Sequence, residues 1–152
     1  MDATRTVVTF RSASFNDKES KSHFINPDNY GDDVALWLAG ELEKRNIRIE
    51  RKGVFPGQED FGWYFNFVFG NSSFCLVVGS HHQGDGFEWI IWVERRCSFL
   101  ENLVGGRQRH IPQEVPQMVH SILTESSTAT NIIWHNYQEF KRGVETTASA
   151  NP

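Results

Sequence analysis

The chain contains few cysteines and no long apolar run. Cys75 and Cys97 are its two cysteines in 152 residues, and Met1 to Phe10 lacks the continuous apolar stretch of a secretion signal. We therefore expect two reduced thiols rather than a disulfide framework. No window approaches the ~18 apolar residues that a membrane-spanning helix needs. The sequence thus predicts a soluble, cytoplasmic protein that has no membrane partner.

A basic excess is also missing. The chain has 15 Lys and Arg against 19 Asp and Glu, which gives a formal charge of −4. Duplex nucleic acid and anionic membranes favour basic surfaces, so we expect no nucleic-acid partner. The Walker loop, the Gly-x-Gly-x-x-Gly and Gly-x-Ser-x-Gly motifs and the His-Glu-x-x-His motif are all absent from the sequence. We expect no cofactor.

Aromatic residues, in contrast, are abundant and regularly spaced. They make up 13% of the chain, and five of them occupy every odd position of one segment: Phe61, Trp63, Phe65, Phe67 and Phe69. Successive side chains of a strand point to opposite faces, so these five rings are expected on one face. The segment therefore predicts a strand at the centre of the core.

The hydrophobic pattern predicts one helix before this strand and one after it. Val34, Trp37, Leu38 and Leu42 recur at helical spacing, and Asn46 tolerates the left-handed conformation that ends a helix. A second helix is expected to open at Pro112. Strands are expected at residues 5–11, 47–54, 61–69, 74–79, 87–94 and 132–134.

The element order β-α-β-β-β-β-α-β is typical of an α+β domain. We expect a mainly antiparallel sheet of five to six strands with two helices packed on one face. The length suits one core, so residues 1–140 are predicted to form a single domain. Residues 141–152 are small and polar, which predicts a flexible C-terminal tail.

The loop after Phe69 sets the pairing of the aromatic strand with the next one. We expect Phe69 opposite Phe74 and Phe67 opposite Leu76 across this loop. The alternate residues then form the other side of the sheet, which we call the second face: Tyr64, Asn66, Val68, Cys75, Val77, Glu88, Ile90, Trp92 and Glu94.

Two interpretations of the second face remain open. A soluble monomer seldom leaves such an apolar patch in water, so residues 12–25 or 97–110 are expected to fold over it. Alternatively, the face binds a ligand, a protein partner or a second copy of the chain. In that case the candidate binding residues are Tyr64, Asn66, Glu88, Trp92 and Glu94.

Acidic residues and histidines supply the candidates for chemistry. Glu59 and Asp60, with a histidine such as His82, are the candidate catalytic residues because paired carboxylates serve as general acid and base. Acid pairs in polar turns are also commonly solvated. His81, His82 and Asp85 are the candidate metal ligands. Adjacent strand histidines point to opposite faces, so a surface loop is favoured over a metal site.

A second acid pair, Asp32 and Asp33, stands in the first turn of the first predicted helix. Carboxylates there interact favourably with the helix dipole, whatever else they do. We interpret this pair as structural rather than catalytic.

Two segments carry a likeness to other proteins: Phe24-Ile25-Asn26-Pro27 through Trp37-Leu38, and Glu59-Asp60-Phe61-Gly62-Trp63. In them the chain resembles small uncharacterised bacterial proteins in which an acidic, Gly-Trp-containing strand follows an N-terminal helix. The resemblance implies a stand-alone domain in the bacterial cytoplasm. By analogy of fold, small acidic α+β domains act as inhibitors, immunity-type partners or adaptors. We therefore expect a non-enzymatic binding or interaction protein, with a protein partner or a homodimer; the alternative is a small hydrolase.

Overall fold

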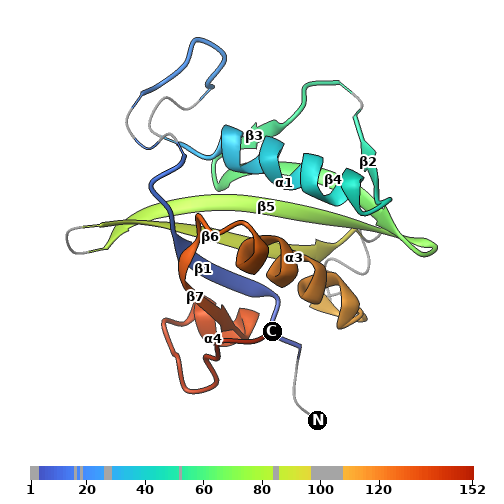
Figure 1. Cartoon of the computed structure of the whole chain (residues 1–152), viewed down its shortest axis with the longest axis vertical. Coiled ribbons are helices and arrows are strands. Elements are labelled where there is room, and N and C mark those ends of the chain that lie inside the picture. The colour runs from blue at the N-terminus through green and yellow to red at the C-terminus, as the bar shows by residue number, and fades with distance from the viewer. Residues whose placement is uncertain are drawn as a thin grey trace.

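One antiparallel sheet carries the fold (Figure 1). The computed structural model describes residues 4–15, 17, 19–25, 29–51, 53–83, 86–96 and 108–152, with the backbone alone for residues 82, 83 and 86. Its elements, in chain order, are β1 (Val7–Arg11), α1 (Asp32–Lys44), β2 (Arg48–Glu50), β3 (Gly57–Glu59), β4 (Gly62–Phe69), β5 (Ser72–Gln83), β6 (Gly86–Arg95), α3 (Glu114–Glu125), β7 (Thr130–His135) and α4 (Tyr137–Lys141).

The strands are arranged in the order β2-β4-β5-β6-β1-β7, and β3 pairs with β4 beside β2. All of these pairings are antiparallel. Helices α1 and α3 lie next to each other on one face of the sheet (Figure 1). The predicted α+β class with a mainly antiparallel sheet is therefore confirmed. The structure adds the short strand β3 and the short helix α4 to the predicted elements.

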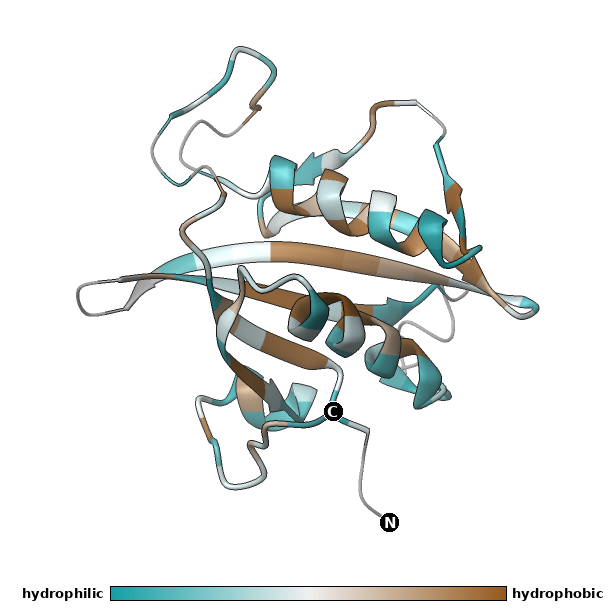
Figure 2. Ribbon diagram, in the orientation of Figure 1, coloured by the Kyte–Doolittle hydropathy of each residue, from teal (hydrophilic) through white to brown (hydrophobic). Residues whose placement is uncertain are grey.

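Helix α1 forms where the apolar spacing predicted it. The five residues Val34, Ala35, Leu38, Ala39 and Leu42 are fully buried, and they recur every three or four positions along one side. The chain changes direction just after α1 at Asn46, whose φ of 64° lies in the left-handed region. Hydrophobic residues line the sides of α1 and α3 that face the sheet, and the central part of β5 (Figure 2).

The aromatic strand is the centre of the core, with one exception. Trp63, Phe65 and Phe67 are at most 2% exposed, as predicted. Phe61 was predicted on the same face, and this is wrong: it precedes β4 and is 52% exposed. The reason is Gly62, whose φ of 146° is unfavourable for residues with a side chain. This conformation breaks the strand alternation and places Phe61 near Trp92 on the second face.

The predicted register between β4 and β5 is also wrong, by two residues. Phe67 lies opposite Phe74 and Phe69 opposite Ser72, so the hairpin loop is Gly70-Asn71 alone. Gly70 has a φ of 60°, which tight two-residue hairpin loops require. Because the shift is even, the side chains of β4 and β5 stay on their predicted faces.

The segment from residue 12 to residue 25 does not cover the second face in its described part. Phe15 packs against Trp89 with ring centroids 6.1 Å apart, and Phe24 packs against Trp63 at 5.0 Å. Both tryptophans belong to the core side of the sheet. This first covering interpretation is therefore wrong. The other covering segment lies outside the described residues, apart from its last three.

The C-terminal residues, expected to form a flexible tail, return to β7. Ser149 forms a bridge with Trp134, with backbone N–H groups donating in both directions at 2.6 and 2.9 Å. Arg5 Nε donates to the Thr147 carbonyl at 2.6 Å. These contacts attach the last residues to the edge of the sheet.

Candidate functional site

The second face is the side of the sheet opposite α1 and α3. The strand register places one row of its residues side by side across five strands: Tyr64, Val77, Trp92, Val7 and His135. Helix α4 covers the β7 end of this row, where Phe140 packs on His135 with ring centroids 5.1 Å apart. The β4 end carries the predicted binding residue Tyr64.

Three rings form an aromatic cluster on the second face: Phe61, Tyr64 and Trp92. Phe61 lies between the other two, with its centroid 6.3 Å from Tyr64 and 6.2 Å from Trp92. Trp92 Nε1 donates a hydrogen bond to Glu94 Oε1 at 3.0 Å, which fixes the indole beside a carboxylate. The structure thus brings together three predicted binding residues, Tyr64, Trp92 and Glu94. It adds Phe61, which the alternation pattern assigned to the core.

Of the other two predicted binding residues, Asn66 lies beside the cluster and Glu88 lies apart from it. Asn66 follows Tyr64 by two positions on β4 and shares a row with Cys75 and Glu94. Glu88 lies at the far end of β6, where its Oε1 is 3.2 Å from His81 Nε2. The five predicted binding residues therefore share a face, but Glu88 is separate from the other four.

A cavity of about 680 Å³ opens on the second face between β1, β6, β7 and the residues after α4. Its walls include Thr9, Glu88, Ile133, His135 and Val144. Ile133 and Val144 are each 38% exposed, so the cavity has an apolar rim beside polar groups. This cavity was not predicted from the sequence, because α4 and the turn after it were not predicted either.

His135 is the buried polar residue of this cavity. It is 3% exposed, and its Nε2 lies 3.0 Å from Thr9 Oγ1. Its Nδ1 has no hydrogen-bond partner among the residues described. Burial lowers the pKa of His135, and the nearby carboxylate of Glu145 opposes that shift. Burial thus favours the neutral imidazole, in which one ring nitrogen accepts hydrogen bonds.

The predicted catalytic residues are only partly placed. Glu59 and Asp60 are exposed at the end of β3 and in the turn that follows, where Asn29 Nδ2 donates to the Glu59 carbonyl at 3.2 Å. The side chain of His82 lies outside the described residues, as does Asp85. The convergence of the two carboxylates with a histidine stays a prediction.

Among the predicted metal ligands, the structure describes the side chain of His81 alone. Its side chain is 42% exposed and faces Glu88. Within the described part of the chain, no three His, Cys, Asp or Glu side chains are grouped so as to hold a metal ion. The interpretation of this hairpin as a surface loop stays a prediction as well.

One polar cluster was missed by sequence reasoning. Asp32 is 2% exposed, and its Oδ2 accepts from Lys21 Nζ at 3.1 Å and lies 3.0 Å from His23 Nε2. The sequence pattern placed Asp32 at a helix start, but nothing in that pattern indicated that the preceding loop would fold back onto its carboxylate.

No family model, curated protein or solved structure matches this chain. None of the helices in the described ranges is long and apolar enough to cross a membrane.

Proposed function

We propose that the chain is a non-enzymatic binding protein of the bacterial cytoplasm, and that it recognises a protein partner through the second face. The observation that carries the proposal is the aromatic cluster with its carboxylate. Phe61 is 52% exposed, and the Trp92 indole beside it is bonded to Glu94. Large aromatic side chains are frequent anchors at interfaces because they bury much area and lose little side-chain entropy.

Exposed apolar residues support the same face. Six large hydrophobic side chains are exposed in the described part of the chain, and three of them lie on this side: Phe61, Ile133 and Val144. Phe61 belongs to the aromatic cluster, and Ile133 and Val144 line the cavity by β7. The face thus offers an aromatic anchor point and, toward β7, a cavity that admits a side chain of the partner.

The charges favour a different protein over a second copy. A two-fold dimer would bring two copies of the aromatic cluster together, and with them the Glu94 carboxylate that each copy holds beside Trp92. A partner with basic side chains around an apolar anchor complements this carboxylate and also suits the net charge of −4. The same charge disfavours nucleic acid. We therefore propose a heterologous, basic protein partner and a monomeric free chain.

Photocrosslinking tests the proposal. A photoreactive benzoylphenylalanine at position 61 should give one discrete protein adduct in cells of the source organism. The same group at Gln117, exposed on α3 on the opposite face, is the control and should not give that adduct. Trp92→Ala should suppress the adduct and weaken the purified complex by about 2 kcal/mol, or about thirtyfold.

The result that would contradict the proposal is equally definite. If Trp92→Ala lowers the melting temperature and leaves the adduct unchanged, the ring is part of the fold rather than of an interface. Light scattering during size-exclusion chromatography adds a second check, because a dimer that Trp92→Ala dissociates would replace the heterologous partner with a second copy.

The alternative of a small hydrolase has less structural support. General acid–base catalysis needs groups held against a bound substrate. Glu59 and Asp60 are instead exposed, at the end of β3 and in the turn that follows. The alternative remains testable by Glu59→Gln and Asp60→Asn, which should leave binding of the partner unchanged.

A further inference from the structure

A second cavity lies on the other side of the molecule, at the first turn of α1. We call it the α1 groove; its volume is about 420 Å³. Its apolar walls come from three segments: Ile25 before the helix, Leu36 on the helix, and Val54 and Phe55 on the loop before β3. Ile25, Leu36 and Val54 are 81%, 45% and 83% exposed. Half of the six exposed large hydrophobic residues in the described part thus line one groove.

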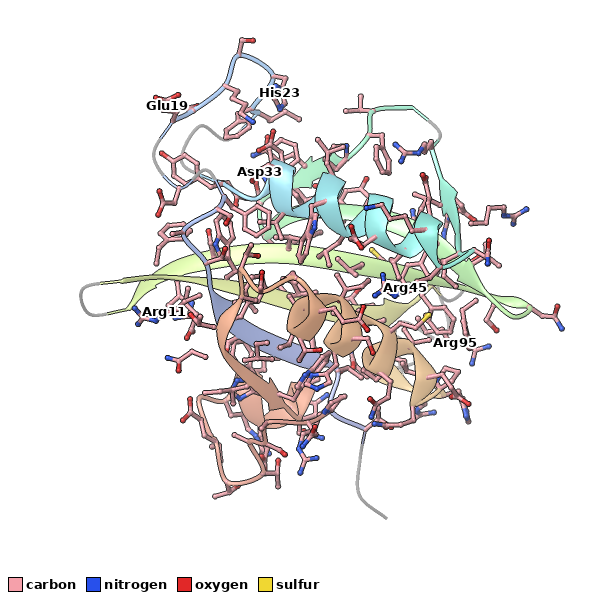
Figure 3. All side chains as sticks on the ribbon, viewed as in Figure 1. Arg11, Glu19, His23, Asp33, Arg45 and Arg95 are labelled. Carbon is pink, nitrogen blue, oxygen red and sulfur yellow. The ribbon has the colours of Figure 1, made fainter. Side chains whose placement is uncertain are left out.

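One end of the α1 groove is polar, and its charges are arranged asymmetrically. The Asp32 side chain is 3% exposed, whereas those of Lys21 and His23 are 43% and 55% exposed. Figure 3 shows His23 on the loop beside the start of α1. Asp32 Oδ1 is enclosed and has no partner among the described residues, so it is closed to an incoming ligand as well. The polar groups exposed at this end are therefore the Lys21 ammonium and the His23 imidazole.

The ammonium keeps donors for a ligand. A lysine has three N–H donors, and within the described ranges Lys21 Nζ bonds to Asp32 Oδ2 alone. A hydrogen bond from an ammonium is strongest to an anionic oxygen, and the Lys21 ammonium, rather than the enclosed Asp32 carboxylate that pairs with it, is the charge exposed at this end. The polar end therefore suits an acceptor with negative charge.

We propose that the α1 groove binds a small amphipathic carboxylate. Its apolar body lies between Ile25, Leu36 and Val54, and its carboxylate accepts from Lys21 Nζ beside the His23 ring. The volume is within the range of small-molecule pockets, about 300 to 1,000 Å³. This site is independent of the proposed partner surface, since α1 covers the opposite face of the sheet.

Three matched probes test the chemistry: phenylbutyrate, its neutral amide and the corresponding phenylbutylamine. Binding to the full chain is followed in ¹H–¹⁵N NMR spectra. The Trp63 indole is the reporter, because Trp63 lines the groove and its Nε1 donates to the Asn29 carbonyl at 2.8 Å. The acid should bind about tenfold more tightly than the amide, since a charge-assisted bond replaces a neutral one. The amine should bind most weakly.

Two pairs of variants locate the site. Lys21→Met should abolish the preference for the acid and leave affinity for the amide unchanged. Lys44→Met is its control, because Lys44 also pairs with a carboxylate of α1 but lies at the far end of that helix. Val54→Ser should weaken the acid and the amide alike, whereas Val144→Ser, on the second face, should change neither.

Several outcomes would overturn the proposal. Equal affinity for acid and amide, tighter binding of the amine, or a preference that survives Lys21→Met would each remove the role of the ammonium. Chemical-shift changes that leave the Trp63 indole signal unaffected would show that the ligand binds outside the α1 groove. Binding of peptides with an apolar C-terminal residue, with none of the small acid, would replace a small-molecule site with a peptide site. If Lys21→Met unfolds the chain, the wild-type titrations still test the preference for the acid, and Val54→Ser still tests the location of the site.

Discussion

Truncation of Phe67 gives the most direct test of where the core lies. This ring is fully buried, it stacks on Phe74 with centroids 5.6 Å apart, and it meets Phe65 at 6.4 Å. An aromatic side chain of this kind buries at least about 150 Å². At about 25 cal/mol per Å², its burial contributes about 4 kcal/mol. Phe67→Ala should therefore lower the free energy of unfolding by about 4 kcal/mol, within the range of about 3 to 5 measured for buried rings.

Urea denaturation followed by tryptophan fluorescence measures this loss. With a slope of about 2 kcal/mol per M, the midpoint should fall by about 2 M at unchanged slope. Phe61→Ala is the matched control: both positions are odd in the same aromatic run, but Phe61 is 52% exposed. Its midpoint should fall by less than about 0.5 M. Equal shifts for the two variants would refute the assignment of Phe67 to the core and of Phe61 to the second face.

Further predictions concern His135, two glycines and the β5–β6 hairpin. Burial lowers the pKa of His135 below its ordinary 6.5, so on acidification the unfolded chain binds this proton before the folded chain does. Stability should therefore fall as the pH drops below that value. In thermal melts from about pH 7.5 to about pH 5, the melting temperature of His135→Gln should fall less than that of the wild type. Gly62→Ala should cost at least about 2 kcal/mol in urea, because a Cβ there would lie 2.0 Å from a backbone oxygen. Gly70→Ala, with open space around it, should cost about 1 kcal/mol. His81→Ala should change stability by less than about 1 kcal/mol and leave the metal content of the purified protein unchanged.

Side-chain alternation predicted most of the core, because it depends on a local property of strands. Trp63, Phe65 and Phe67 on β4 and Trp89 and Ile91 on β6 are all buried as expected. The register was not predictable in the same way. Loops of different even lengths preserve the faces, so alternation does not distinguish them; in the structure the two-residue loop has Gly70 at a φ of 60°.

The candidate sites were predicted where they follow a single strand and missed where they depend on a loop. Trp92 and Glu94 were identified together because they are two residues apart on β6. Phe61 was misassigned because Gly62 ends the alternation. The approach of Lys21 to Asp32 depends on a loop that folds back across the helix start, and no local sequence pattern encodes such a contact.

The way β4 is flanked has a consequence for aggregation. Six of its eight residues are aromatic or β-branched and none is charged, a composition typical of segments that assemble into cross-β fibrils. Its outer edge is occupied by β2 and β3, which have three residues each. Arg48 and Glu50 of β2 and Glu59 of β3 place charges along that edge. Detachment of either short strand would expose a hydrophobic template to other copies, so conditions that loosen this edge should promote aggregation before global unfolding.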